Sequence, residues 1–162
     1  RFEVSLGDEK ALVLVMNQKV YSCGDCVAAS VELVGVKRVC TGLVVSLESH
    51  ETLLMKRADI SYTQGTADGQ PPTQTTLHTN VTEMTPYMRN IQVLLPIPLS
   101  APATLMTTVC KVEWTLRLQI TTVAVDAPSG TDGQTVTWSA PLIVAPPPTH
   151  HPLFAEASVP LS

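Results

Sequence analysis

Hydrophobic and polar residues alternate along much of this chain of 162 residues. The alternation is clearest in segment 110–120, where Val112, Trp114 and Leu116 share one face with two further aliphatic residues. Charged and polar side chains occupy the positions between them. A period of two predicts a β-strand with one buried face, so this segment should form a half-buried strand.

Segments 27–33 and 41–47 show the same period of two. The connection between them, 35–38, is short and contains a glycine, which is typical of a hairpin turn. We therefore expect these two strands to pair with each other. Six further strands are predicted, at residues 2–6, 11–16, 55–62, 75–84, 90–97 and 135–144.

Helix-breaking residues recur throughout the chain, with 13 prolines and 8 glycines. Proline costs about 3 kcal/mol inside a helix, and no segment has helical periodicity. Many short strands separated by turn signals predict an all-β fold, an antiparallel, immunoglobulin-like β-sandwich. Segments 64–73 and 127–134 are expected to be hairpin connections. We predict one domain over residues 1–145, followed by a proline-rich tail over 146–162, which could dock on the domain or bind a partner.

The composition limits the classes of partner. The chain carries 14 acidic and 10 basic residues, a net charge of −4, so nothing favours a nucleic-acid partner. Apolar runs fall far short of the roughly 20 residues that cross a bilayer. The basic doublets at 37–38 and 56–57 predict at most a peripheral contact with anionic lipid.

Cys23 and Cys26 are two residues apart, as in redox disulfides and in half of a zinc site. The segment after them is a predicted strand, whereas a redox pair needs a helix N-terminus. A structural zinc site needs four ligands, but Cys40 and Cys110 stand alone in the sequence. We therefore expect a tight turn at Gly24 and no metal. A secreted chain could instead form two disulfides and carry sugar at Asn80, but the irregular cysteine spacing favours reduced thiols.

No motif predicts catalysis. The paired histidines at 150–151 adjoin the tail, and the serine at 129 lacks the strand and helix of a nucleophile elbow. A phosphate-cradling glycine loop is also missing. We predict no catalytic residue, no cofactor and no enzyme activity.

Two passages resemble the arrestin-like clan. The first is a turn between two strands at Gly24 and Asp25. The second is a strand ending near Pro96, a crossover containing Pro98 and Pro102, and a long strand with the pattern Lys-x-x-Trp-x-Leu-Arg. The residues that carry the resemblance in the crossover, the long strand and the last strand are Pro96, Pro98, Trp114, Leu116, Arg117 and Trp138.

The second passage is similar to the C-terminal lobe of the smaller, arrestin-like subunit of the two-subunit Golgi Rab guanine-nucleotide exchange complex. The resemblance implies an arrestin-like β-sandwich without catalytic residues of its own. It also implies a cytoplasmic location at Golgi membranes, a larger partner subunit, a contact with a Rab GTPase, and a role in retrograde transport to the Golgi. An arrestin-related cargo adaptor, a retromer-type sorting subunit and a secreted adhesion module stay open as alternatives.

Overall fold

The computed structural model describes residues 1–6, 9–34, 38–54, 72–85, 88–128 and 133–148. These residues form strands and connections, and they include no helix that is long and apolar enough to cross a membrane. In chain order the strands are β1 (Phe2–Leu6), β2 (Glu9–Met16), β3 (Val20–Ser22), β4 (Cys26–Leu33), β5 (Arg38–Leu53), β6 (Thr73–Met84), β7 (Asn90–Pro96), β8 (Leu105–Met106), β9 (Cys110–Ala124) and β10 (Gln134–Ala145).

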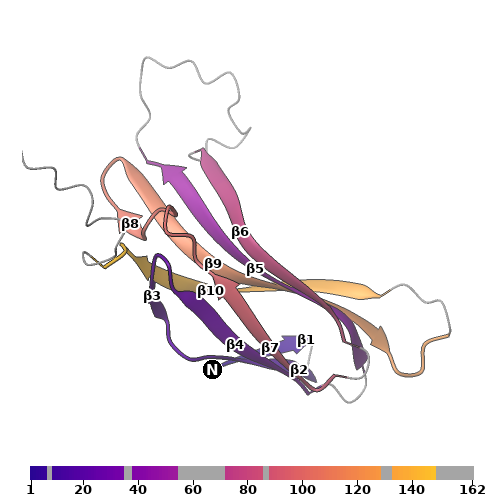
Figure 1. The fold of residues 1–162 in the computed structure, drawn as a ribbon. Helices are drawn as coiled ribbons and strands as arrows, with labels where there is room; N and C mark the ends of the chain where they lie inside the picture. The colour runs from indigo at the N-terminus through magenta and orange to yellow at the C-terminus, as the bar shows by residue number, and fades with distance from the viewer. Residues whose placement is uncertain (7–8, 35–37, 55–71, 86–87, 129–132, 149–162) are drawn as a thin grey trace, which may run out of the picture.

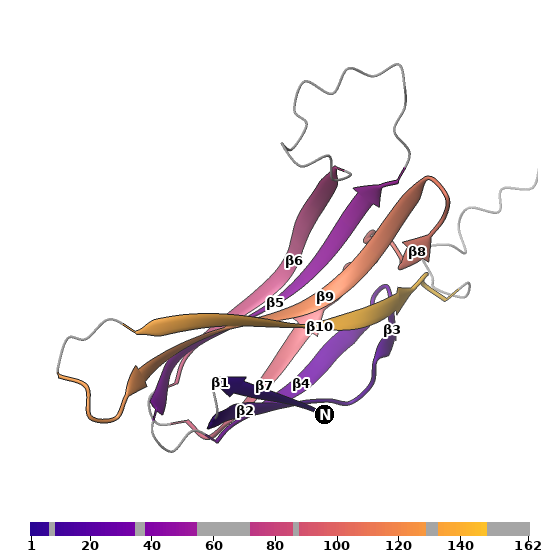
Figure 2. The ribbon, with the colours of Figure 1, turned by 180° about the vertical axis from the view of Figure 1, so that it is seen from behind.

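The described strands form two sheets. The four-stranded sheet has the order β1-β2-β4-β7, and the six-stranded sheet has the order β3-β10-β9-β5-β6, with β8 paired to β9. All pairs are antiparallel except β3 with β10. The sheets face each other, and β5, β6 and β9 extend past the small sheet at one end (Figures 1 and 2). The expected all-β, antiparallel β-sandwich is confirmed.

The core lies between the two inner faces. Val112, Trp114 and Leu116 of β9 are buried, as the alternation predicts. Opposite them, β2, β4 and β7 contribute Leu, Val, Ile and Ala side chains from alternate positions. This burial of aliphatic side chains is the main source of stability, since each buried side chain contributes about 1.5–3 kcal/mol.

The predicted pairing of 27–33 with 41–47 is wrong. These segments form β4 and part of β5, which lie in different sheets. β4 pairs with β2 and β7, and β5 pairs with β6 and β9. A period of two identifies a strand with one buried face but does not identify its neighbour. The connection after β4 therefore carries the chain from one sheet to the other.

The observed strands differ in extent from those predicted. β5 runs from Arg38 to Leu53 and so extends past both ends of the predicted segment 41–47. β3 and β8 were not predicted, and they contain only three and two residues. The predicted strand at 55–62 lies outside the described residues, as do most of the loop 64–73 and residues 149–162 of the tail. The strands that flank the two predicted hairpin connections pair antiparallel, and β10 ends at Ala145.

Candidate interaction site at the crossover end

The Gly-Asp turn and the proline-bearing crossover meet at one end of the sandwich. The amide of Gly24 donates to the carbonyl of Ile97 at 3.0 Å, and the amide of Ile97 donates to the carbonyl of Asp25 at 2.8 Å. Within the turn, Asp25 Oδ2 accepts the amide of Ser22 at 2.7 Å. Two passages about 70 residues apart in the sequence are thereby joined by backbone bonds.

Gly24 is required by both conformation and space. Its φ of 93° is a conformation that residues with a side chain rarely adopt. A Cβ at this position would lie 2.7 Å from Leu99 Cδ2, so the crossover packs directly on the glycine. Pro98 opens this part of the crossover with a turn, in which its carbonyl accepts the amide of Ala101 at 3.1 Å.

The two cysteines of the turn have different surroundings. Cys23 is buried, and its Sγ donates to the carbonyl of Ala101 at 3.3 Å, whereas Cys26 is exposed at the start of β4. Burial raises the pKa of the Cys23 thiol. A raised pKa disfavours the thiolate, which is the reactive form in redox and metal chemistry. Across the residues that the structure describes, no three His, Cys, Asp or Glu side chains gather as a metal site would need.

Trp114 connects the crossover to the large sheet. Its side chain is 1% exposed, and its Nε1 donates to the carbonyl of Pro102 at 2.8 Å. The ring of His78 stacks on the indole with centroids 4.4 Å apart. His78 Nε2 lies 2.8 Å from Ser49 Oγ. These contacts give the indole a partner on its ring face and at its nitrogen.

The Ser49 and His78 pair was not predicted, because His78 reaches the core only through a β-bulge. In the β5–β6 register, Leu47 pairs with Thr79 and Glu48 with Leu77, so His78 is the extra residue. Burial lowers the pKa of His78, which favours the neutral ring at pH 7. Ser49 is 0% exposed, so its hydroxyl cannot reach a substrate. The pair therefore has a packing role rather than a nucleophilic one.

The remaining residues of the family pattern lie elsewhere. Leu116 is buried in the core, and Arg117 lies on the outer face, where its Nη1 is 3.4 Å from Glu48 Oε1. Trp138 is partly buried and packs on Phe2 with ring centroids 5.4 Å apart. The structure thus brings together Gly24, Asp25, Pro96, Pro98 and Trp114 at the crossover end, but not Arg117 or Trp138.

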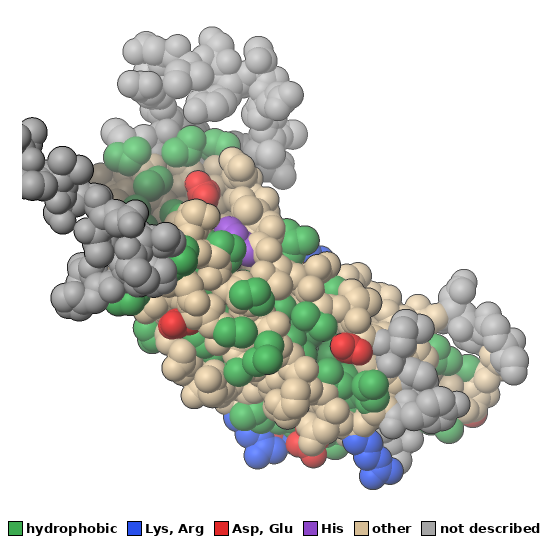
Figure 3. All heavy atoms as spheres, in the orientation of Figure 1, with side chains coloured by type: hydrophobic (Ala, Val, Ile, Leu, Met, Phe, Trp, Pro, Cys, Tyr) green, Lys and Arg blue, Asp and Glu red, His purple; other side chains and the backbone are tan. Residues whose placement is uncertain are grey.

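Exposed apolar side chains surround the start of β9, beyond the crossover. We call these side chains the apolar rim; they belong to Leu53, Leu54, Leu105, Met106 and Val109. Register places them together, since Leu53 pairs with Cys110 and Met106 pairs with Lys111. Figure 3 shows hydrophobic side chains at this end of the molecule.

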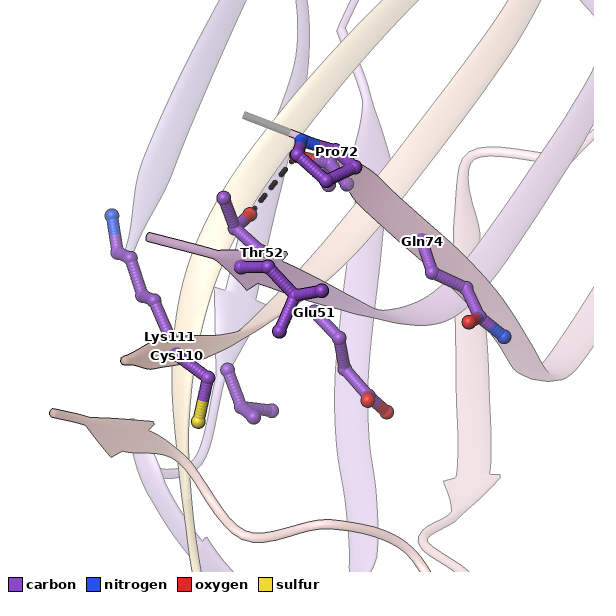
Figure 4. Close-up of a pocket in the computed structure, with 9 residues that line it drawn as sticks. Glu51, Thr52, Pro72, Gln74, Cys110 and Lys111 are labelled. Carbon is purple, nitrogen blue, oxygen red and sulfur yellow. Dashed lines mark hydrogen bonds between the residues drawn. The ribbon is translucent and has the colours of Figure 1, made fainter. Parts of the chain in front are cut away.

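A hollow of about 310 Å³ lies beside the apolar rim. β5 and β6 contribute Glu51 and Gln74 to its lining, and β9 contributes Cys110 and Lys111 (Figure 4). An exposed apolar group of this kind, next to polar side chains, is typical of a protein interaction surface.

Comparison with known proteins identifies the family. No curated protein matches this chain significantly. One matching solved structure is the crystal structure of Spo0M, a sporulation control protein from Bacillus subtilis, with 13% sequence identity and a TM-score of 0.48. The match covers 83% of this chain and 48% of that protein, so this chain spans about half its length. The Rgp1 family model matches residues 1–123, which include the turn, the crossover and most of β9. The chain therefore belongs to the Rgp1 family.

Proposed function

We propose that this chain is a non-catalytic protein-interaction lobe of a vesicle-trafficking subunit. In this role it supports activation of a Rab GTPase by binding a larger subunit of the exchange complex. The complex would act at the cytoplasmic face of Golgi membranes, in retrograde transport. The family match over residues 1–123 carries this proposal.

The structure of the crossover end supports a scaffold rather than an exchange site. Its buried polar groups are used within the fold: the Trp114 indole binds Pro102, and Ser49 contacts His78. Among the described residues, this end exposes several large apolar side chains next to polar ones such as Gln74 and Thr107. Burial of apolar surface away from water favours association of two proteins, and this contribution needs no titratable group.

We propose the apolar rim as the surface that contacts the larger subunit. Met106 is 69% exposed and Val109 is 47% exposed, although neither side chain carries charge. Met106 belongs to β8 and Val109 directly precedes β9, at the end where β9 extends past the small sheet (Figure 1), so a partner could reach both without moving the core. The buried centre of a protein interface is typically more apolar than the rest of the surface and contains few charged residues.

The first experiment measures nucleotide release from a panel of Golgi Rab GTPases. The purified chain alone should leave the release rate unchanged, while the chain mixed with the larger subunit should bind it and support release. Acceleration by the chain alone would contradict the scaffold role. Failure to co-purify with the larger subunit would contradict the assignment to the exchange complex.

A second experiment tests the apolar rim. Met106→Asp together with Val109→Asp should weaken binding of the larger subunit by about tenfold or more, since charges replace apolar contacts. Leu94→Asp is the matched control, because Leu94 is 64% exposed on β7, away from the rim. Equal binding by the rim variant and the control would show that the contact lies elsewhere. Circular dichroism should show an unchanged fold for both variants.

A further inference from the structure

Three of the four sheet edges are protected against pairing with another strand. β1 has five residues, a bulge after Val4, and the Glu3 carboxylate paired with Lys10. β3 has three residues and pairs only with Ile143, Val144 and Ala145, so the rest of that edge belongs to β10, which contains Pro141. β7 ends in Pro96, whose carbonyl accepts the hydroxyl of Thr79 at 2.9 Å. Short strands, charges, bulges and proline are the usual means by which proteins block edge pairing.

The fourth edge, β6, is long and nearly uncharged. It has 12 residues, of which Glu83 alone is acidic and none is Lys, Arg or Pro. No described strand pairs with its outer side, and Figures 1 and 2 show it at the margin of the large sheet. Its one irregularity is the bulge at His78, near the middle of the strand.

Hydrogen bonds at the two ends of β6 show which backbone groups point outward. The amide of Leu53 donates to the carbonyl of Pro72, so alternate residues from 72 to 76 face β5. At the other end, the amide of Thr85 donates to the carbonyl of Thr41, so the backbone groups of residues 83, 81 and 79 also point toward β5. The residues that alternate with these direct their backbone amides and carbonyls away from β5. They include Thr75, Leu77, Asn80 and Thr82.

These four outward positions are symmetric about the bulge. In an antiparallel pair of two β6 strands with residues 73 and 84 opposite each other, Thr75 faces Thr82 and Leu77 faces Asn80 of the other copy. Every outward residue then meets an outward residue. The bulge at His78 lies between Leu77 and Asn80, and these two residues face each other across the dimer. The bulges of the two copies therefore lie side by side. The full length of both strands overlaps.

The side chains also suit this register. Glu83 would lie opposite Gln74, so no two like charges meet, and Thr76 would lie opposite Val81. On the outer face, Leu77 is 54% exposed and would be covered in part by the neighbouring strand. An isologous contact of this kind closes with two copies and leaves no further edge of β6 free.

We propose that the outer edge of β6 binds a second copy of this chain, with two β6 strands antiparallel about a two-fold axis between His78 and Thr79. The two six-stranded sheets become continuous across the dimer. This inference is independent of the proposed function, because it uses β6 and leaves the apolar rim free.

Sedimentation equilibrium of the 162-residue chain tests the proposal. The chain should show a concentration-dependent equilibrium between monomer and dimer. Leu77→Lys combined with Asn80→Lys places lysines opposite each other at both cross-strand positions, and should raise the dissociation constant by about tenfold or more. Leu77→Glu combined with Asn80→Lys places opposite charges there and should restore much of the dimer.

The matched control is Leu94→Lys, an exposed apolar residue on β7 that should leave the equilibrium unchanged. Asn80→Pro gives a backbone test, because it removes an outward amide without removing a bond to β5. Circular dichroism establishes that each variant is folded. A chain that stays monomeric up to about 1 mM, the weak limit of specific association, would overturn the proposal.

Two further outcomes would also overturn it. If the like-charge and opposite-charge variants dimerise as the unaltered chain does, the dimer uses another surface. If the chain is monomeric and Asn80→Pro instead weakens binding of the larger subunit, the edge of β6 takes a strand of that subunit. Rim variants that lose the larger subunit but keep the dimer would separate this inference from the proposed function.

Discussion

The two sheets differ in length, and this difference separates stability from interaction. The strands of the small sheet have at most eight residues, whereas β5 and β9 of the large sheet have 16 and 15. Where the sheets overlap, the side chains between them are buried. Where the large sheet continues alone, it carries the apolar rim and the hollow. Because the large sheet is longer than the small one, β5 and β9 each contribute one part to the core and another part to an exposed surface.

The overlap and the extension meet at Trp114. The residues before it in β9, Cys110 and Lys111, line the hollow, and Leu116 after it is fully buried. The crossover covers this boundary through the bond from Trp114 to Pro102. Substitutions in the overlap should therefore reduce stability, while those in the extension should mainly affect binding.

The largest effect is expected for Trp114→Ala. Removal of a fully buried indole leaves a cavity and should lower the free energy of unfolding by about 3–5 kcal/mol. The variant also loses the bond to Pro102 and the ring stacked on His78. Denaturant unfolding measures the change, with Trp138→Ala as control. Because Trp138 is only partly buried, its loss should cost less; equal losses would contradict the assignment of the core to the overlap.

A smaller effect is expected for Gly24→Ala. A side chain at a φ of 93° is strained, and the new Cβ would meet Leu99, so the free energy of unfolding should fall by about 1–3 kcal/mol. Gly42→Ala is the matched control, because a Cβ there would lie 3.9 Å from Thr121 Cβ, an ordinary van der Waals distance. Thermal unfolding compares the two. A Gly24→Ala variant as stable as the control would show that the turn is not held by the crossover.

The smallest effect concerns the pH dependence contributed by His78. Because burial lowers its pKa in the folded chain, the unfolded chain binds the proton at higher pH. Stability should therefore fall as pH drops below about 6.5, the ordinary pKa of histidine, and level off below the folded-state value. The group faces Ser49, Glu51 and Trp114.

The variant His78→Gln isolates this contribution. Its stability should decrease less than that of the unaltered chain between pH 7 and pH 5, because the titrating group is gone. Denaturant unfolding at a series of pH values measures the difference. A steeper decrease in the variant would contradict a neutral, partly buried ring at His78.

Much of the strand content could be predicted because a strand with one buried face alternates hydrophobic and polar residues within its own segment. The alternation in 110–120 and 135–144 identified β9 and β10 to within a few residues at either end. The turn at Gly24 was also predictable, since glycine next to a strand indicates a special backbone conformation. Two- and three-residue strands such as β8 and β3 were missed because so few residues cannot establish a period.

The candidate site was only partly predictable. The crossover and the Trp strand were identified by resemblance, but their contact through Pro102 was not. The apolar rim was not predicted because Leu53 and Met106 lie outside the predicted strands. Their exposure depends on the extension of the large sheet past the small one. The place of His78 depends on a bulge, and nothing in the residues around it indicates one.

The sequence by itself determined the class of fold, the residues of most strands and the family to which the chain is similar. Those features depend on each segment's own alternation and on short motifs. Tertiary structure alone decided that β4 and β5 lie in different sheets, that Trp114 contacts the crossover, and that β6 is at the end of the large sheet among the described strands. Pairing and exposure are properties of the neighbours that a strand acquires on folding, and a period of two is equally compatible with several neighbours.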